Sequence, residues 1–97
     1  MHIIKKGTID AFIDQYPDSG NALLRWYITT KTRAWQNLKD VKETFGDVDY
    51  VGDDLYVFNI KGNKYRLITR IFFKAQLVYI RFIGTHADYD KVDLDNL

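Results

Sequence analysis

The sequence of 97 residues contains no cysteine and only one serine and one proline. Without cysteine the chain has no disulfide, no thiolate nucleophile and no cysteine-ligated zinc site. The single serine, Ser19, stands where a helix is expected to begin, so the usual serine-nucleophile motifs have no candidate either. These absences exclude several classes of enzyme, and they agree with the cytoplasmic location that we expect.

Several other patterns are missing as well. There is no GxxxxGK phosphate-binding loop, no GxGxxG after a strand, and no apolar run near the roughly 18 residues of a membrane helix. His2 and His86 stand at opposite ends of the chain, and neither metalloprotease nor calcium-loop spacing is present. We therefore expect no metal, no cofactor and no contact with a membrane, and we interpret the acidic stretch GDVDYVGDD as a solvated loop.

What is present is the composition of a small globular protein. Aliphatic and aromatic residues make up 46% of the chain and charged residues 28%. A chain of this length can build one modest core. No repeat, low-complexity segment or linker divides the sequence, so residues 1–97 are predicted to form a single domain.

Three helices are predicted in the first half of the chain. The run GTIDAFIDQYP places apolar residues at helical spacing, with Thr8 as N-cap and the only proline ending the pattern. A second helix is expected to run to about Thr30, capped by the group Asp18 to Gly20, and to form a hairpin with the first. The stretch NLKDVKETFG predicts a short third helix, with Asn37 as its cap and Gly46 at its end.

From residue 48 onward the apolar period changes to two, and the residues become β-branched and aromatic, as in strands. The runs LYVFNI, KYRLITRIFF and LVYIRFIG are separated by turns short enough for hairpins, and the opening MHII is a further short strand. Two to three N-terminal helices packed on a mainly antiparallel sheet give an α+β fold.

Alternation along the middle long strand separates two faces. The face predicted to be core carries Tyr65, Leu67, Thr69, Ile71 and Phe73. The other face carries Lys64, Arg66, Ile68, Arg70 and Phe72, and Phe82 joins it in one register. Such a surface can bind phosphates and stack bases, or it can be the solvated face of an ordinary sheet. The register of the last strand decides whether Arg81 lies opposite Arg70 or on the other face.

Charge is segregated along the chain in a way that favours a polyanionic partner. Six basic residues and no acidic one lie from Lys61 to Arg81, whereas acidic residues crowd 43–54 and the C-terminal tail. A local positive surface attracts nucleic acid whatever the distant charges sum to. The same cations equally fit strands that carry lysine and arginine on a wet face for solubility.

Acid–base chemistry without a metal remains open to this sequence. Cleavage of RNA by its own 2′-hydroxyl needs groups that transfer protons and cations that stabilise the phosphorane, but no protein nucleophile. His86 is a candidate for proton transfer, with Tyr89 on the same side of a helical turn. Alternatively, Thr85 and Asp88 form a capping pair, which leaves His86 exposed and Tyr89 packing at the sheet edge.

Several stretches of the sequence resemble one family of bacterial proteins. The elements FNIKGNKYRL, VYIRFIGTH and YD, together with the opening MHII and the helix ending in YP, are similar to HigB-type toxins. These are RelE-like toxins of type II toxin-antitoxin systems. The resemblance implies a microbial-ribonuclease-like domain that cleaves mRNA on the ribosome and arrests translation and growth. It also implies a cognate HigA antitoxin with a helix-turn-helix domain, and contact with DNA only through that antitoxin.

The resemblance and the chemistry above select two groups of residues. The predicted catalytic residues are His86, Arg66, Arg81 and Tyr89. His86 is the expected acid or base, the two arginines are clamps on the scissile phosphate, and Tyr89 is a partner of His86 or a stacking platform. The predicted RNA-binding residues are Lys61, Asn63, Lys64, Arg70 and Lys74. The same surface could instead serve a non-catalytic RNA-binding module, or bind a partner protein along an edge strand.

Overall fold

The structure, a computed structural model, describes all 97 residues. Its elements follow one another as β1 (His2–Ile4), α1 (Lys6–Gln15), η1 (Pro17–Ser19), α2 (Gly20–Lys31), α3 (Leu38–Thr44), β2 (Val48–Tyr50), β3 (Leu55–Ile60), β4 (Tyr65–Phe72), β5 (Leu77–Thr85), α4 (His86–Asp90) and η2 (Leu94–Asn96), where η marks a 3-10 helix. The predicted N-terminal helices and the predicted strands are confirmed. No helix combines the length and the apolar character needed to cross a bilayer.

The strands form one five-stranded sheet in the order β1-β5-β4-β3-β2. Neighbouring strands are antiparallel except β1 and β5, which run parallel. The α+β fold with a mainly antiparallel sheet is therefore confirmed. β2 corrects the interpretation of GDVDYVGDD as a loop, because Val48 is buried and pairs with Phe58 of β3.

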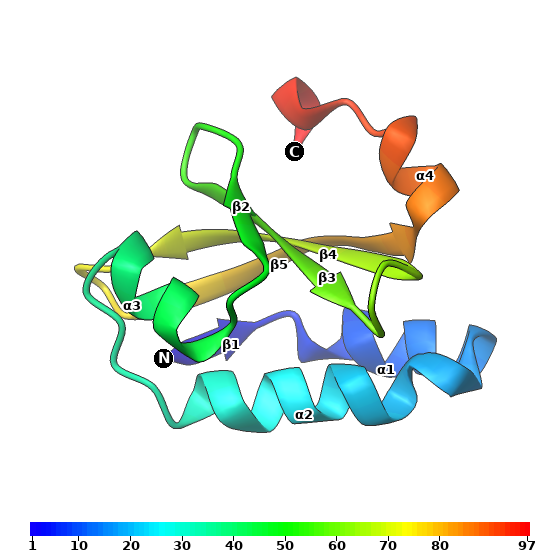
Figure 1. Cartoon of the computed structure of the whole chain (residues 1–97), viewed down its shortest axis with the longest axis horizontal. Helices are drawn as coiled ribbons and strands as arrows, with labels where there is room; N and C mark the ends of the chain where they lie inside the picture. Colours follow the sequence, from blue (N-terminus) through cyan, green and yellow to red (C-terminus); the bar gives the residue numbers. More distant parts are fainter.

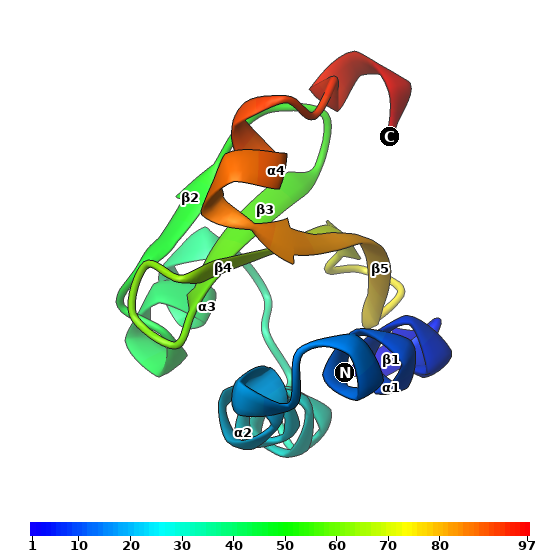
Figure 2. The ribbon, with the colours of Figure 1, turned by 90° about the vertical axis from the view of Figure 1, so that its right-hand side faces the viewer.

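The N-terminal helices cover one face of the sheet. α1 and α2 lie side by side below the sheet in the view of Figure 1, and the end-on view of Figure 2 shows the same layer. Between helices and sheet lies the main core, which includes Ile9, Leu23 and Trp26 from the helices and Phe58 and Leu67 from the strands. The predicted core face of β4 is confirmed, since its residues from Tyr65 to Ile71 that point this way are at most 1% exposed.

The last residues of the chain cover part of the opposite face (Figure 1). A second small core contains Leu55, Val57 and Ile68, and Phe82, Tyr89 and Leu97 pack against it. The expectation that Ile68 and Phe82 belong to an open base-stacking surface is therefore wrong, because the C-terminal segment occupies that surface. Phe72, at 39% exposure, remains open to solvent.

One predicted helix cap is wrong, one is confirmed in position only, and the third is confirmed. α1 begins before Thr8, after Lys5 in the left-handed region at φ 74°. Ser19 does not cap α2 with its side chain, because its hydroxyl donates to the carbonyl oxygen of Tyr16 at 2.7 Å. Asn37 caps α3 as predicted, since its side chain accepts a hydrogen bond from a backbone amide in the first turn.

A β-bulge sets the register of β5 at Arg81. Ile68 pairs with Phe82, but the next residue of β4, Thr69, pairs with Ile80, so Arg81 has no partner on β4. The extra residue interrupts the alternation of β5. Neither of the two regular registers considered from the sequence therefore applies.

Candidate functional site

A shallow, open depression lies at the end of the sheet where the β3–β4 turn meets α4, on the right-hand side of Figure 1. Asn63 and Lys64 of the turn line it together with His86 of α4, and Tyr16 and Asp18 enter from the junction between α1 and α2. Three segments far apart in sequence therefore meet here.

The β3–β4 turn has a backbone in which glycine is favoured. Lys61, at φ 53°, and Gly62, at φ 65°, both lie in the left-handed region, which only glycine adopts without steric cost. The amide of His86 donates to the carbonyl oxygen of Lys64 at 3.2 Å. The carbonyl oxygen of Asn63 accepts from Nη1 of Arg66 at 3.1 Å. The turn is thereby joined both to α4 and to the arginine of β4.

His86 lies within the predicted capping arrangement and also borders the depression. The predicted capping box is present, since the Thr85 hydroxyl accepts from the Asp88 amide at 3.1 Å and the Asp88 carboxylate accepts from the Thr85 amide at 3.3 Å. His86 is the first residue of α4, and its side chain is 54% exposed. Its Nδ1 lies 3.4 Å from Oδ2 of Asp90, one helical turn further along. The capping box therefore fixes the start of α4, and the imidazole of His86 remains exposed at the rim of the depression.

The carboxylate of Asp18 binds three side chains of the β3–β4 hairpin. Oδ1 accepts a hydrogen bond from the Tyr65 hydroxyl at 2.5 Å, and Oδ2 accepts from the ammonium groups of Lys64 at 2.5 Å and Lys61 at 3.2 Å. Sequence reasoning missed this cluster, because Asp18 is 43 or more residues from each partner and reads locally as a helix cap. One signal was available, since the hydroxyl of a buried tyrosine such as Tyr65 needs a partner.

These contacts shift the pKa of the groups that make them. Hydrogen bonds from Lys64, and then from Tyr65, hold the pKa of the Asp18 carboxyl far below its ordinary value of 3.8. The hydrogen bond to Asp18 in turn raises the pKa of Lys64 above 10.5 and that of Tyr65 above 10.0. At neutral pH the carboxylate therefore offsets one of the two positive charges of the lysines.

Arg66 lies beside Tyr89 on the sheet face that carries the C-terminal segment. The guanidinium carbon is 5.8 Å from the centre of the Tyr89 ring, which is within cation–π range. Tyr89 also packs against the small core around Ile68, so its predicted packing role is confirmed. The ring therefore both closes the core and holds the arginine near the turn.

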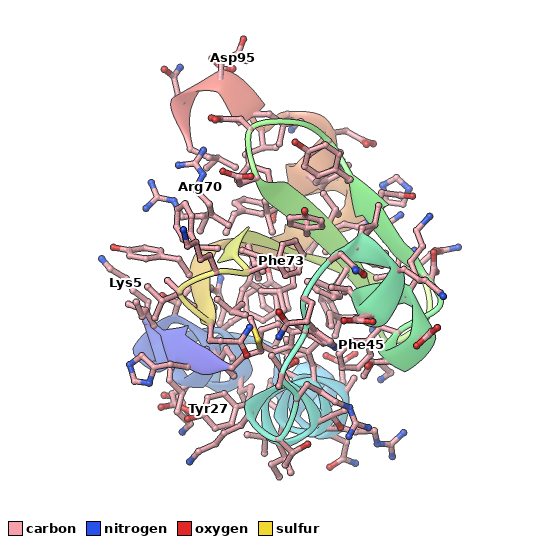
Figure 3. All side chains as sticks on the ribbon, turned by 90° about the vertical axis from the view of Figure 1, so that its left-hand side faces the viewer. Lys5, Tyr27, Phe45, Arg70, Phe73 and Asp95 are labelled. Carbon is pink, nitrogen blue, oxygen red and sulfur yellow. The ribbon has the colours of Figure 1, made fainter.

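Three predicted residues lie away from His86. They are Arg81, predicted as a clamp on the scissile phosphate, and the predicted RNA-binding residues Arg70 and Lys74. Arg81 places its guanidinium over the ring of Tyr79, 5.0 Å from its centre. Arg70 donates to the Asp53 carboxylate at 2.8 Å, and Figure 3 shows it at the surface on the side of the C-terminal segment. Lys74 lies in the β4–β5 turn, at the opposite end of the sheet.

The structure thus separates Arg81, Arg70 and Lys74 from the other predicted residues. One end of the sheet brings together Lys61, Asn63, Lys64, Arg66, His86 and Tyr89. No three or more histidine, aspartate or glutamate side chains are placed together to hold a metal ion. An imidazole beside ammonium and guanidinium groups can transfer a proton and stabilise negative charge on a bound phosphate.

Comparison with known proteins gives consistent matches over most of the chain. The family model described as HigB toxin, the RelE-like toxic component of a toxin-antitoxin system, matches residues 19–92. The mRNA interferase toxin HigB of Escherichia coli (strain K12) is 31% identical over 93 residues, which cover 93% of this chain and 88% of that protein. The mRNA interferase HigB of Shigella flexneri matches equally well. The mRNA interferase HigB of Escherichia coli O6:H1 is 29% identical over 94 residues, covering 95% of this chain and 91% of that protein.

Proposed function

Because the chain belongs to the HigB toxin family of RelE-like toxins, we propose that it is an mRNA interferase, the toxin of a type II toxin-antitoxin system. Such an enzyme is an endoribonuclease, and cutting of messenger RNA arrests translation and growth. The matched relatives carry this activity in their names, and the family match includes the β3–β4 turn and α4.

One observation of the site carries the proposal. His86 and Lys64 are joined by a backbone hydrogen bond, with Asn63 and Arg66 bound to the same turn. A group able to move a proton and groups able to bind phosphate therefore occupy one small region. Cleavage of RNA by its own 2′-hydroxyl requires both kinds of group and no nucleophile from the protein.

In the proposed reaction the 2′-oxygen bonds to the adjacent phosphorus and the bond from phosphorus to the 5′-oxygen breaks. His86 transfers a proton, either accepting it from the 2′-hydroxyl or giving it to the departing 5′-oxygen. Arg66 and Lys64 bind the scissile phosphate and stabilise the charge of the phosphorane. Tyr89 supports Arg66 through its ring.

The remaining predicted residues extend the RNA contact beyond the scissile phosphate. Lys61 and Asn63 lie in the same turn, and their position supports a role in binding adjacent RNA backbone. Arg81, Arg70 and Lys74 lie further along the sheet, where contact with more distant phosphates is the role that their positions favour. Arg70 would exchange the Asp53 carboxylate, which is largely exposed, for a phosphate.

We further infer that the chain acts on messages held by the ribosome, in the cytoplasm, with no metal or other cofactor in the reaction. A shallow depression with few candidate catalytic groups gains most from a substrate whose geometry is already fixed. A cognate HigA-like antitoxin with a helix-turn-helix domain would neutralise the toxin, and any association with DNA would come through that antitoxin.

Induced expression in a bacterial host tests the function and the site together. The wild-type chain is expected to arrest growth. His86→Ala removes the proton-transferring group, which contributes on the order of 100-fold or more to such a step, so growth should continue. Arg66→Ala removes a phosphate contact and should also relieve the arrest. His2→Ala is the matched control, because it removes the other exposed histidine, in β1, and should stay toxic.

Two results would contradict the proposal in different ways. A wild-type chain that accumulates in folded form without slowing growth would contradict the toxin function. Folded His86→Ala and Arg66→Ala variants that both remain fully toxic would instead contradict the assignment of this site.

A further inference from the structure

Asp18 has an unusual place in the molecule for a surface carboxylate. It lies in η1, between two helices, yet its three side-chain partners all belong to the β3–β4 hairpin. Its side chain is 36% exposed, and it borders the same depression as His86. The hydrogen bonds of Asp18 therefore join the α1–α2 junction to this end of the sheet.

The carboxylate is held in a fixed orientation by a buried residue. Tyr65 is 1% exposed, and its ring packs against Phe12 at a centroid distance of 5.3 Å and against Tyr16 at 5.7 Å. The Tyr65 hydroxyl therefore has a defined position, and its bond to Oδ1 directs Oδ2 of Asp18 towards the lysines. The packing of the Tyr65 ring in the core therefore fixes the orientation of the Asp18 carboxylate.

The two lysines gain order from this contact without losing their ability to bind phosphate. A lysine side chain has more rotamer freedom than most, so an unpaired ammonium samples a wide volume. Each ammonium has three N–H donors, and Asp18 takes one from Lys64 and one from Lys61. The other donors remain for phosphate oxygens.

We propose that Asp18 is a positioning residue for RNA cleavage, which holds the Lys64 ammonium and the β3–β4 turn in place beside His86. The proposal rests on the proposed function. Lys64 is fixed at both ends, since its ammonium binds Asp18 and its carbonyl oxygen binds the His86 amide. Loss of the carboxylate would free the ammonium and loosen the turn, so that Lys64 would no longer be held in one position beside His86.

If Asp18 is a positioning residue, its substitution should affect RNA binding and RNA cleavage differently. Asp18→Asn removes a negative charge close to the RNA, so binding should be unchanged or tighter. The cleavage step should be slower, because displacement of a catalytic contact by about 1 Å can cost about 100-fold. If the carboxylate merely opposed RNA, its removal would also tighten binding, but the cleavage step would not slow down. The rate of cleavage therefore separates the two roles.

The test is cleavage of mRNA on stalled ribosomes, measured as a function of toxin concentration and corrected for the folded fraction. For Asp18→Asn we expect the saturating rate to fall about 10- to 100-fold and the half-saturating concentration to stay equal or decrease. Asp18→Glu keeps the charge and should recover part of the rate. Asp14→Asn is the matched control, because it removes a carboxylate of α1 that has no hydrogen-bond partner, and it should cleave as the wild type does.

Tyr65→Phe keeps the proposal testable if Asp18→Asn does not fold. It preserves the packed ring and removes only the hydroxyl that orients the carboxylate. We therefore expect a smaller fall in the saturating rate, again without an increase in the half-saturating concentration. A folded Asp18→Asn variant with the saturating rate of the wild type would overturn the inference. If Asp18→Asn does not fold, the same result for Tyr65→Phe would overturn it. A fall shared by Asp14→Asn would also overturn it. A wild-type chain that cuts no RNA would overturn the proposed function as well, so the two failures are distinguishable.

Discussion

Asp18 and His86, two residues from distant parts of the chain, bind the two ends of Lys64. One binds its ammonium and the other binds its carbonyl oxygen. Neither contact has a local signal in the sequence, because residues 18 and 64 meet only once the sheet is folded against the helices. His86 and Tyr89 could be selected in advance, whereas the contacts that orient Lys61 and Lys64 could not.

The lowered pKa of Asp18 gives a prediction on stability and pH. Hydrogen bonds from Lys64 and Tyr65 favour the ionised form in the folded chain, so Asp18 stabilises the fold above its ordinary pKa of 3.8. This contribution is lost progressively as pH falls below 3.8 towards the folded pKa. Urea unfolding should therefore show wild type more stable than Asp18→Asn at neutral pH, with the difference shrinking below about pH 3.8.

Asp14→Asn serves as the control for this comparison, since it removes an exposed carboxylate of α1 with no bonded partner. Its difference from the wild type should stay small over the whole range. A gap between wild type and Asp18→Asn that is constant from pH 7 to pH 2.5 would show that the ionised carboxylate is not what stabilises the junction.

At the scale of elements, the short helix α4 depends on the close approach of β5 to it. It has only five residues, so its position rests on the Thr85–Asp88 capping box and on the absence of a side chain at Gly84. A Cβ atom at Gly84 would lie 2.5 Å from Cζ of Phe82 and 3.0 Å from Cβ of Asp88. Glycine therefore allows the Phe82 ring and α4 to approach the β5 backbone closely here, and α4 carries His86.

Gly84→Ala should accordingly destabilise the protein. The added methyl group forces the Phe82 ring or α4 to move, at a cost of about 1–3 kcal/mol in the free energy of unfolding. Chemical denaturation measures this change. Gly46→Ala is the control, because nothing lies within 4 Å of a Cβ there, and its stability should be unchanged or slightly higher. Equal stabilities for the two variants would contradict the packing account of Gly84.

The elements themselves were predictable where an apolar period was strong. Ile9 and Phe12 repeat at helical spacing, and Leu67 and Ile71 at strand spacing, and each group is buried as expected. That the C-terminal segment covers Ile68 was not predictable. Residues 91–97 show no helical or strand period of apolar residues, and they contribute to the second core only through scattered side chains such as Leu97. The bulge at Arg81 likewise has no local signal, since it arises from how two strands pair.

At the scale of the whole molecule, the site lies where the layers meet. Figure 2 shows helices α1 and α2 below the sheet and the C-terminal segment above it. The α1–α2 junction supplies Asp18, the hairpin supplies Lys64, and the C-terminal segment supplies His86. Acidic partners already bind several of the predicted RNA contacts, as Asp53 binds Arg70. The segregated charges of the sequence are therefore partly paired in space, and this includes Lys61 and Lys64, which bind Asp18.

The central claim is that this chain cuts messenger RNA with His86 in the reacting region. Its most direct test is to add the purified chain to a translation reaction and map new 5′ ends in the message. Wild type and His2→Ala should produce the same new ends within translated sequence, and His86→Ala should produce them about 100-fold more slowly or not at all. Binding of the wild-type chain to the translating ribosomes without any new 5′ end would contradict the account and identify a non-catalytic RNA-binding module.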